Sequence, residues 1–465
     1  MAIQQWVMAG RIASSPVCQR AVDKSKCLHA ETEMPDTKPI TNEAQHKMPQ
    51  IHLEPTKSTG LSFDERVCSR CMGHRALCGV SPCPLVMRAR ALFNIDKAVT
   101  GLNLAGSSPP AVFVGSYGYP KVLAGPLIPP LRGEETALME RPDLWLDKTL
   151  DQILAYRFSL VRTKRFLPVD AAINPPRLLA ETQTLALSDT PTSSEALLIK
   201  RPSFTTVLTG RTLPVGPSAP LSYFQLDDNP HVSKPIDRIT SDTDLKAGDG
   251  VLELFQEGIR QEHVTRLLSV GLLGIRKSRR LVPTQWSITA FDDIVGKRLH
   301  KQVLRFPVVN DFSVYADHAL GNTVVLLLLP SAWQFEALEC WLGGSNPPVM
   351  SDHEWFKGRK DYAQVIVGAY YATRLPALEH LMDAHKQAGV IVFMEVDPSK
   401  WVPLGVWRFR EIARRALASP AKRFSTLEEA VSEISLHLTN PVQRWLAASR
   451  IYSELISQTQ LTDFS

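Results

Sequence analysis

The sequence predicts a protein of the α/β or α+β class, in which two layered domains follow an N-terminal zinc module with four cysteines. The chain has 465 residues, more than one ordinary hydrophobic core accommodates. Short continuous apolar runs, such as residues 324–329, alternate with segments whose apolar residues recur at helical spacing, which is typical of layered folds. Four of the seven cysteines fall between residues 68 and 83. The pattern does not specify the order of the strands.

The composition is that of a globular, mildly basic protein. Hydrophobic residues make up 44% of the chain and charged residues 21%, and the net charge of +5 permits binding to a polyanion without requiring it. No apolar run approaches the roughly 20 residues that a membrane span needs. The N-terminus lacks the apolar segment of a signal peptide, so we expect a cytoplasmic protein without membrane contact.

Residues 1–58 are polar and show no apolar periodicity, so we expect a disordered or weakly ordered tail. A targeting presequence is the alternative. Glu31, Glu33 and Asp36 argue against it, because such presequences avoid acidic residues.

The cysteine cluster predicts a structural zinc site. Its four expected ligands are Cys68, Cys71, Cys78 and Cys83. Thiolates bind Zn²⁺ tetrahedrally, and a two-residue gap lets one turn present two sulfurs to one ion. A disulfide or a redox pair fits less well, because nothing indicates secretion and redox pairs normally occur alone. His74 could replace one sulfur. Four thiolates close the shell, so the metal would stabilise the fold and leave no open position for catalysis.

The first two thirds of the chain contain further segments with a clear period. Apolar spacing predicts helices at residues 85–98, 145–161 and 259–271. Residues 178–207 are interpreted as strands broken by a polar loop at 188–194.

The last third is predicted to begin with a strand at 323–329, followed by a helix at 333–342. Glycines before Asn346-Pro347-Pro348 mark the preferred domain boundary. Beyond it we expect, in order, a helix holding Tyr371 to Met382, a buried strand at 390–393, another strand at 402–407 and an amphipathic helix at 408–417.

Cations dominate residues 276–305. The candidate nucleic-acid ligands are Arg276, Lys277, Arg279, Arg280, Lys297 and Arg298, followed by Lys301 and Arg305. Such a patch contacts backbone phosphates, although a solvated surface whose charges point apart is the alternative. Trp286 could stack on an unpaired base. With Ile288 on the same face of a period-2 strand, a core position is preferred.

Asp292 and Asp293 are the candidate catalytic carboxylates. Adjacent acids could hold Mg²⁺ or Mn²⁺ that activates water at a phosphodiester, with partners among Glu336, Glu339, Asp352 and Glu354. The preferred alternative is structural: the two carboxylates pair with nearby arginines or cap a following helix.

Two weaker candidates lie beyond residue 345. The helix at 408–417 offers a second cationic surface, which an ordinary wet helix face explains nearly as well. Its cations are Arg408, Arg414 and Arg415, with Lys422 and Arg423 beyond it. Tyr370, Tyr371 and Arg374 could bind a nucleotide, but core packing is preferred.

The last eight residues fit the QxxLxxF pattern of a sliding-clamp-binding peptide. A short helical turn would place Leu461 and Phe464 in an apolar pocket, while Gln458 hydrogen-bonds at its edge. Ser465 stands where a second aromatic residue is usual. The segment also resembles the bacterial clamp peptide, so the clamp could be of the PCNA type or of the bacterial type.

Several blocks of the sequence resemble the archaeal Nre family of DNA-repair proteins. The blocks are Leu77-Cys78-Gly79, Cys83-Pro84, Pro109-Pro110, Val112 to Gly115, Gly118 to Val122, Gly125-Pro126, Trp286 to Ala290 with Asp292-Asp293, Gly368 to Tyr371 with Arg374-Leu375, and Pro403 to Trp407. The resemblance covers about residues 60 to 417. It implies a role in DNA-damage repair and binding to the sliding clamp, but no defined chemistry.

Together these features predict four regions: a tail at 1–58, an Nre-like N-terminal domain at 59–345 with the zinc module at 68–83, an Nre-like C-terminal domain at 346–450, and a clamp-binding tail at 451–465. The expected function is that of a nucleoid-associated repair factor that binds DNA through basic surfaces and is recruited by the clamp, with other repair proteins as further partners. A metal-dependent, nuclease-like repair enzyme that uses Asp292 and Asp293 is the alternative. RNA binding is a third possibility, because zinc modules and basic patches serve both nucleic acids.

Overall fold

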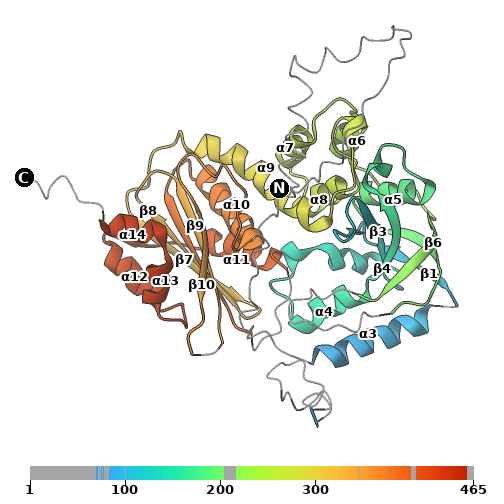
Figure 1. The fold of residues 1–465 in the computed structure, drawn as a ribbon, viewed down its shortest axis with the longest axis horizontal. Coiled ribbons are helices and arrows are strands. Elements are labelled where there is room, and N and C mark those ends of the chain that lie inside the picture. Colours follow the sequence, from blue (N-terminus) through green and yellow to red (C-terminus); the bar gives the residue numbers. More distant parts are fainter. Residues whose placement is uncertain are drawn as a thin grey trace, which may run out of the picture. The chain divides into compact units, whose positions relative to one another are not determined.

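The computed structural model describes residues 70–71, 75, 77, 83–99, 101–203, 216–343, 345–398 and 405–457. They belong to one compact unit and build two six-stranded mixed sheets with helices packed against them (Figure 1). The mixed α/β class expected from the sequence is confirmed. The predictions for residues 1–58, for Cys68 and Cys78, and for residues 458–465 fall outside the described residues.

The first sheet has the strand order β1-β5-β6-β4-β3-β2, and its pairs are antiparallel except β4 with β6. Its strands are β1 (Asn103–Ser108), β2 (Val112–Val114), β3 (Lys121–Ile128), β4 (Val161–Pro168), β5 (Thr192–Leu198) and β6 (Ser218–Leu226). Helix α3 (Pro84–Ala98), which confirms the helix expected at 85–98, packs Ile95 into the sheet's core. Its first residue is proline, whose fixed φ suits the start of a helix.

The segment expected to be a strand from residue 178 is instead helix α5 (Arg177–Leu187). Leucine, alanine, glutamate and glutamine dominate it, and these residues have high helix propensity. Leu178 and Leu185 pack in the same core as Ile95. Strand β5 then begins at Thr192, inside the segment that was expected to be a loop.

Four helices follow the first sheet: α6 (Lys234–Ser241), α7 (Ala247–Gln256), α8 (Gln261–Ser269) and α9 (Thr284–Val303). Helix α8 confirms the helix expected at 259–271. The period-2 strand expected at Trp286 and Ile288 is wrong, because both residues lie in the first two turns of α9, which starts after Pro283. Asp292 and Asp293 lie in the middle of this helix and do not cap it.

The second sheet has the order β10-β9-β11-β8-β7-β12, with β9 and β11 as its parallel pair. Its strands are β7 (Phe312–Ala319), β8 (Asn322–Leu329), β9 (Gln334–Trp341), β10 (Val349–Glu354), β11 (Gly389–Val396) and β12 (Lys422–Phe424). The strands expected at 323–329 and 390–393 are confirmed as β8 and β11. Every residue of β11 is buried, because helices cover both faces of the sheet.

The helix expected at 333–342 is wrong, since residues 334–341 form strand β9. β9 lies between β10 and β11, and its residues 335–340 are all buried. Apolar residues on both faces of a central strand also match a helical period, so spacing alone could not separate the two.

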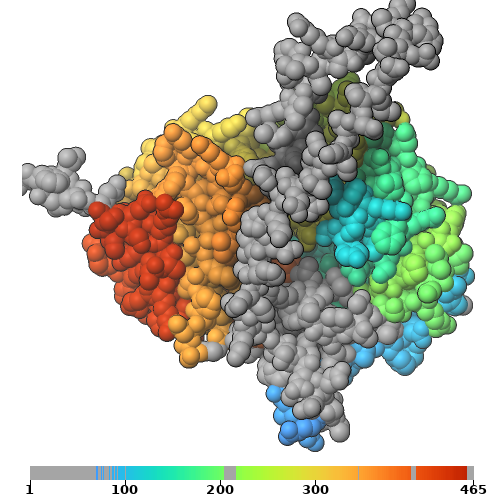
Figure 2. Space-filling view, in the orientation of Figure 1, coloured from blue at the N-terminus to red at the C-terminus, as the bar shows by residue number. Residues whose placement is uncertain are grey.

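Helices α10 (Val367–Asp383) and α11 (Trp407–Ala418) contact one side of the second sheet, while α12 (Leu427–Ser435), α13 (Val442–Ala448) and α14 (Arg450–Ser457) pack against the other (Figure 1). The C-terminal helices form a continuous surface, red in Figure 2. The strand expected at 402–407 is wrong at its end, since Trp407 is the first residue of α11; residues 402–404 lie outside the described residues.

The second sheet takes β7, β8 and β9 from before residue 346 and the other three strands from after it. The expected boundary at Asn346-Pro347-Pro348 therefore falls in the connection between two paired strands, β9 and β10. No helix in the described ranges is long and apolar enough to cross a membrane.

Candidate functional site

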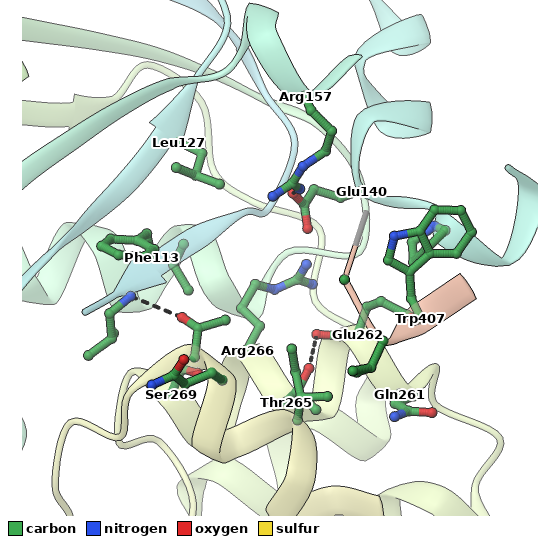
Figure 3. A pocket seen from close by; sticks show the side chains of 18 of the residues that line it. Phe113, Leu127, Glu140, Arg157, Gln261, Glu262, Thr265, Arg266, Ser269 and Trp407 are labelled. Atoms are coloured by element: carbon green, nitrogen blue, oxygen red, sulfur yellow. Dashed lines mark hydrogen bonds and ion pairs between the residues drawn. The ribbon is translucent and has the colours of Figure 1, made fainter. Parts of the chain in front are cut away.

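A cavity of about 350 Å³ lies where several distant segments of the chain meet. Its walls come from β2, from η2 (Glu134–Glu140) and α4 (Leu150–Ser159), from the length of α8, and from the first turns of α9 and α11. In Figure 3, Arg266 extends from α8 toward Glu140 and Arg157 on the facing wall.

Aromatic and aliphatic side chains form much of the wall. Phe113, Leu127, Trp145 and Trp407 all line the cavity. The two tryptophans meet edge to face, with ring centroids 5.2 Å apart. The Nε1 group of Trp145 donates to the carbonyl of Leu138 at 2.7 Å, so this ring is held in place.

Arg266 brings a buried positive charge to the cavity. Its side chain is 7% exposed, and it donates through Nε to the carbonyl of Ala186 at 3.1 Å and through Nη2 to that of Ser188 at 3.3 Å. No carboxylate in the described part of the chain lies within 4.0 Å of it. Burial lowers its pKa to about 9, which means that folding disfavours the charged form.

Arg410 is the second buried arginine in the wall, at 2% exposure. Its Nη2 donates to Oδ2 of Asp292 at 2.5 Å, and Oδ1 of Asp292 accepts from Nε2 of Gln261 at 2.7 Å. Burial raises the pKa of Asp292 to about 6, although the charge of Arg410 acts in the opposite direction. Nε of Arg410 finds no acceptor among the described residues.

Glu140 and Arg157 form a less buried pair on the facing wall. Nη1 of Arg157 donates to Oε1 of Glu140 at 3.1 Å. Burial raises the pKa of Glu140, and Arg157 opposes this shift. About a quarter of each side chain stays exposed, at 27% and 22%, so the pair reaches the rim of the cavity.

The first turns of α9 and α11 add to the positive electrostatic potential of the cavity. Thr284 and Gln285 begin α9, Trp407 begins α11, and all three line the cavity. Neither helix has an acidic residue in its first turn or a side chain that caps its N–H groups. Unpaired N–H groups and the helix dipole favour anions at such positions. Helix α8 also starts here, but it carries Glu262 in its first turn.

The predicted basic cluster divides into two groups. Arg276 and Lys277 are exposed in η5 (Arg276–Ser278), and Lys297 and Arg298 are exposed on α9. Thirteen helical residues separate Thr284 from Lys297, or about 20 Å along α9. Lys297 and Arg298 therefore lie far along α9 from its first residue, whereas Arg276 and Lys277 precede this helix.

Arg279 has a structural role. Its Nε donates to the carbonyl of Gly274 at 2.9 Å, and its Nη2 donates to the carbonyls of Thr240 at 2.8 Å and Asp242 at 3.0 Å. These contacts satisfy carbonyls at the C-terminal end of α6. Arg280 likewise donates to main-chain carbonyls, those of Lys277 and Arg279.

The candidate catalytic carboxylates are separated from their expected partners. Asp292 is bound to Arg410 and Gln261, and Asp293 is 2.7 Å from Nζ of Lys297. Consecutive helical residues do not face each other. In the described ranges, no group of three or more His, Cys, Asp or Glu side chains is placed to hold a metal ion.

The four acids considered as metal partners all have other hydrogen-bond donors. Glu336 accepts from Ser449, Arg450 and Ile451, Glu339 from Trp341, Asp352 from the main chain of residues 364–366, and Glu354 from Trp333 and Arg374. These contacts hold chain segments together around the second sheet.

The second cationic surface is largely neutralised. Arg408 is buried and donates to Asn322, Arg414 pairs with Glu379, and Arg415 pairs with Asp317. Beyond the helix, Lys422 pairs with Glu433, whereas Arg423 is exposed. Tyr370 and Arg374 are buried in the core of the second half, and Tyr371 is buried with them.

The cavity arginines were not among the candidates from the sequence. Arg410 follows the Pro403 to Trp407 block and lies three residues before Ala413 and seven before Leu417, on the apolar side of its helix. A charged residue on the buried face of an amphipathic helix was the available signal. For Arg266 the signal was its place between Val264 and Leu267 in a buried helix. For Arg157 and Glu140 we find no signal in the sequence.

Three of the quoted sequence blocks meet at this cavity: Val112 to Gly115, the start of the block at Trp286 through Ile288, and the end of the block at Trp407. The fold and the site thus define a mixed α/β protein whose arginine-lined cavity is assembled from both halves of the chain.

Comparison with known proteins identifies the family. Residues 77–346 match the family model described as Archaeal Nre, N-terminal, and residues 354–464 match Archaeal Nre, C-terminal. The chain belongs to the Nre family, as the sequence blocks indicated.

Its relatives include DNA repair protein NreB of Archaeoglobus fulgidus, which is 33% identical over 390 residues, covering 83% of this chain and 96% of the relative. DNA repair protein NreA of the same organism is 32% identical over 391 residues, with 82% and 96% covered. DNA repair protein NreA of Haloferax volcanii is 33% identical over 385 residues, with 80% and 91% covered. No solved structure matches.

Proposed function

We propose that this protein is a DNA-repair factor that binds DNA and is brought to its site of action by a sliding clamp, in the cytoplasm at the nucleoid. The observation that carries the repair role is the similarity to proteins named DNA repair protein over more than 80% of the chain. DNA would be bound as a polyanion, through lysines and arginines at phosphates.

Two exposed surfaces support DNA binding. The first consists of Arg276 and Lys277 together with Lys297 and Arg298, which would make separate phosphate contacts at either end of α9. Lys301 lies one helical turn beyond Lys297, and Arg305 follows the end of α9; both are exposed.

The second surface carries exposed aromatic rings beside cations, the combination that binds unpaired bases. Tyr117 is 85% exposed, and Phe166 and Tyr119 are also exposed. Lys121 is exposed on β3 and shares a face of the sheet with Phe166 on β4, because Phe166 pairs with Leu123, two residues after Lys121. The ring of Tyr119 packs on Trp286, 5.3 Å between centroids, so Trp286 supports this surface and is partly buried.

Clamp recruitment would use Gln458, Leu461 and Phe464. Helix α14 ends at Ser457, and the QxxLxxF segment follows directly. The segment would add two apolar anchors and one amide to a pocket on the clamp.

Zinc would be held by Cys68, Cys71, Cys78 and Cys83. Of the two ligands within the described residues, Cys83 is the N-cap of α3, where the helix dipole favours negative groups, and Cys71 is buried. No acidic residue lies in the first turn of α3 to oppose this charge. The metal would stabilise the region before α3.

The test of DNA binding removes cations that are exposed and lack a structural role. Lys277→Gln with Arg298→Gln should lower affinity for labelled DNA and reduce the slope of log K against log salt by about 1.8, since two phosphate contacts are lost. Lys200→Gln, an exposed lysine beyond β5, is the matched control. An unchanged slope would remove these cations from the interface. Single-stranded DNA, duplex DNA and RNA of matched sequence, compared at fixed salt, identify the preferred nucleic acid.

The test of clamp recruitment deletes residues 458–465. The shortened protein should lose clamp pull-down and keep its DNA affinity and melting temperature. Retained pull-down would show that the clamp is bound elsewhere.

A further inference from the structure

We infer that the cavity between β2, α8, α9 and α11 holds a single nucleotide, taken from a DNA strand with its base unstacked. The inference rests on the proposed DNA binding and names what the site takes from the DNA. It is independent of the exposed cations, because none of them lines the cavity.

The polar part of the cavity suits a phosphate. Arg266 and Arg410 are both more than nine-tenths buried in its wall. Arg266 has no carboxylate within ion-pair distance among the described residues, and Nε of Arg410 has no acceptor among them. A buried guanidinium without a carboxylate partner is costly, and a phosphate beside Arg266 would supply the missing negative charge.

The adjoining helix ends strengthen this argument. The first turns of α9 and α11 line the same cavity without an acidic residue or a capping side chain. The N–H groups at these helix ends and the charge of Arg266 thus favour one anion from several directions, whereas the charge of Arg410 is already balanced by Asp292.

The rest of the cavity suits a base. Phe113, Trp145 and Trp407 supply rings, and Ile288 supplies an aliphatic contact. Gln261, Glu262 and Gln285 also line the cavity, and they supply both donors and acceptors for the edge of a base. A volume of about 350 Å³ is at the small end of ligand pockets, so it suits one nucleotide and excludes a duplex.

Tyr117, the most exposed ring of the aromatic surface, adjoins the cavity wall in the chain. Ser116 lines the cavity and accepts a hydrogen bond from Nε2 of Gln285 at 3.1 Å, and the exposed Tyr117 is the next residue. A strand stacked on Tyr117 would therefore present a neighbouring base to the cavity. A base must leave its stack to enter such a pocket, at the least cost where it is already unpaired.

The experiment compares three duplexes of the same length by fluorescence anisotropy: one fully paired, one with a single bulged adenosine, and one with an abasic bulge. The wild-type protein should bind the bulged base on the order of tenfold more tightly than the abasic bulge, as expected for one stacked base. Ile288→Phe, which narrows the cavity without changing charge, should abolish this preference.

Ile294→Phe is the matched control. Ile294 lies on the same helix, is also half-buried and does not line the cavity, so this variant should keep the preference. Arg157→Gln at the rim should lower affinity for the bulged base, whereas Arg238→Gln, another ion-paired arginine outside the cavity, should not. Melting temperatures identify any variant that fails to fold. If one of the phenylalanine variants fails to fold, the comparison of Arg157→Gln with Arg238→Gln tests the inference instead.

Equal affinity for the bulged and the abasic duplex would overturn the inference and leave DNA binding intact. No binding to any duplex or single strand would instead refute the proposed function. Deoxyadenosine monophosphate is a further probe. If it raises the melting temperature of the wild type but not of Ile288→Phe, and no DNA binds, the cavity takes a free nucleotide and the strand as its source is refuted.

Discussion

Asp292 and Arg410 offer the most decisive test of whether the carboxylates at the centre of α9 are structural or catalytic. The change is the removal of one partner at a time, by Asp292→Ala and by Arg410→Met. Both side chains are almost fully buried and 2.5 Å apart, so either substitution leaves an uncompensated buried charge or an unpaired donor.

The expected loss of unfolding free energy is about 3–5 kcal/mol for each single variant, the usual result of breaking a buried ion pair. Asp292→Ala also leaves the amide of Gln261 without its acceptor, so its loss should be at the upper end of this range. The double variant Asp292→Ala with Arg410→Met should lose much less than the sum, because no charge is then left unpaired.

Urea unfolding followed by tryptophan fluorescence measures these three values against the wild type. Asp293→Ala is the control, since Asp293 is half-buried and contacts the exposed Lys297. The structural interpretation fails if both single variants lose less than about 1 kcal/mol. It also fails if Asp292→Asn keeps full stability while a Mg²⁺- or Mn²⁺-dependent cleavage of DNA disappears, because that result makes Asp292 a catalytic ligand.

Three other predictions follow from particular side chains. Cys71→Ser and Cys83→Ser should each lower the zinc content of the purified protein and its melting temperature, while Cys340→Ala, far along the chain on β9, should leave the zinc content unchanged; equal zinc in all three excludes the cysteine site. His263 is buried, and burial lowers its pKa to about 2, so below pH 6.5 the unfolded protein binds one more proton than the folded protein. The free energy of unfolding should therefore decrease by roughly 1.4 kcal/mol for each unit by which the pH is lowered. His263→Gln should flatten this slope in urea unfolding between pH 6.5 and pH 5, and an unchanged slope refutes the assignment to His263. Arg279→Gln should lower the melting temperature, because three carbonyl acceptors lose their donor, whereas Arg276→Gln should lower DNA affinity alone. If Arg276→Gln lowers the melting temperature and Arg279→Gln lowers only DNA affinity, the structural role belongs to Arg276 and the DNA contact to Arg279.

The sequence predicted well those elements whose structure is determined by the local pattern of apolar residues. Residues 323–329 and 390–393 are continuous apolar runs because β8 and β11 are covered on both faces, and no helix of that length would need such a run. The helix at 408–417 was predictable because its apolar residues recur at helical spacing, although the charged Arg410 shares their buried face. Elements that bury both apolar and charged side chains could not be predicted in this way. Residues 334–341 contain Glu336 and Glu339, whose burial depends on partners that spacing cannot show, such as Ser449.

The cavity could not be predicted for a related reason. Its arginines are ordinary charged residues in the sequence. They are distinguished by contacts with residues distant in the chain, such as that of Arg266 with Ala186 and that of Arg410 with Asp292. The family-like blocks were recognisable one by one, but the sequence did not show that Val114, Ile288 and Trp407 line the same space.

The strand order of the second sheet has a practical consequence for dividing this protein. β11, from the second family segment, lies between β8 and β9, from the first, and it is hydrogen-bonded to both along its full length. A polypeptide ending near residue 346 would lack β11 and leave the edges of β8 and β9 without a hydrogen-bonding partner. The complementary fragment would carry the apolar strand β11 without its two neighbours. Each fragment alone should aggregate, and the two should become soluble when they are produced together, by inserting β11 between β8 and β9.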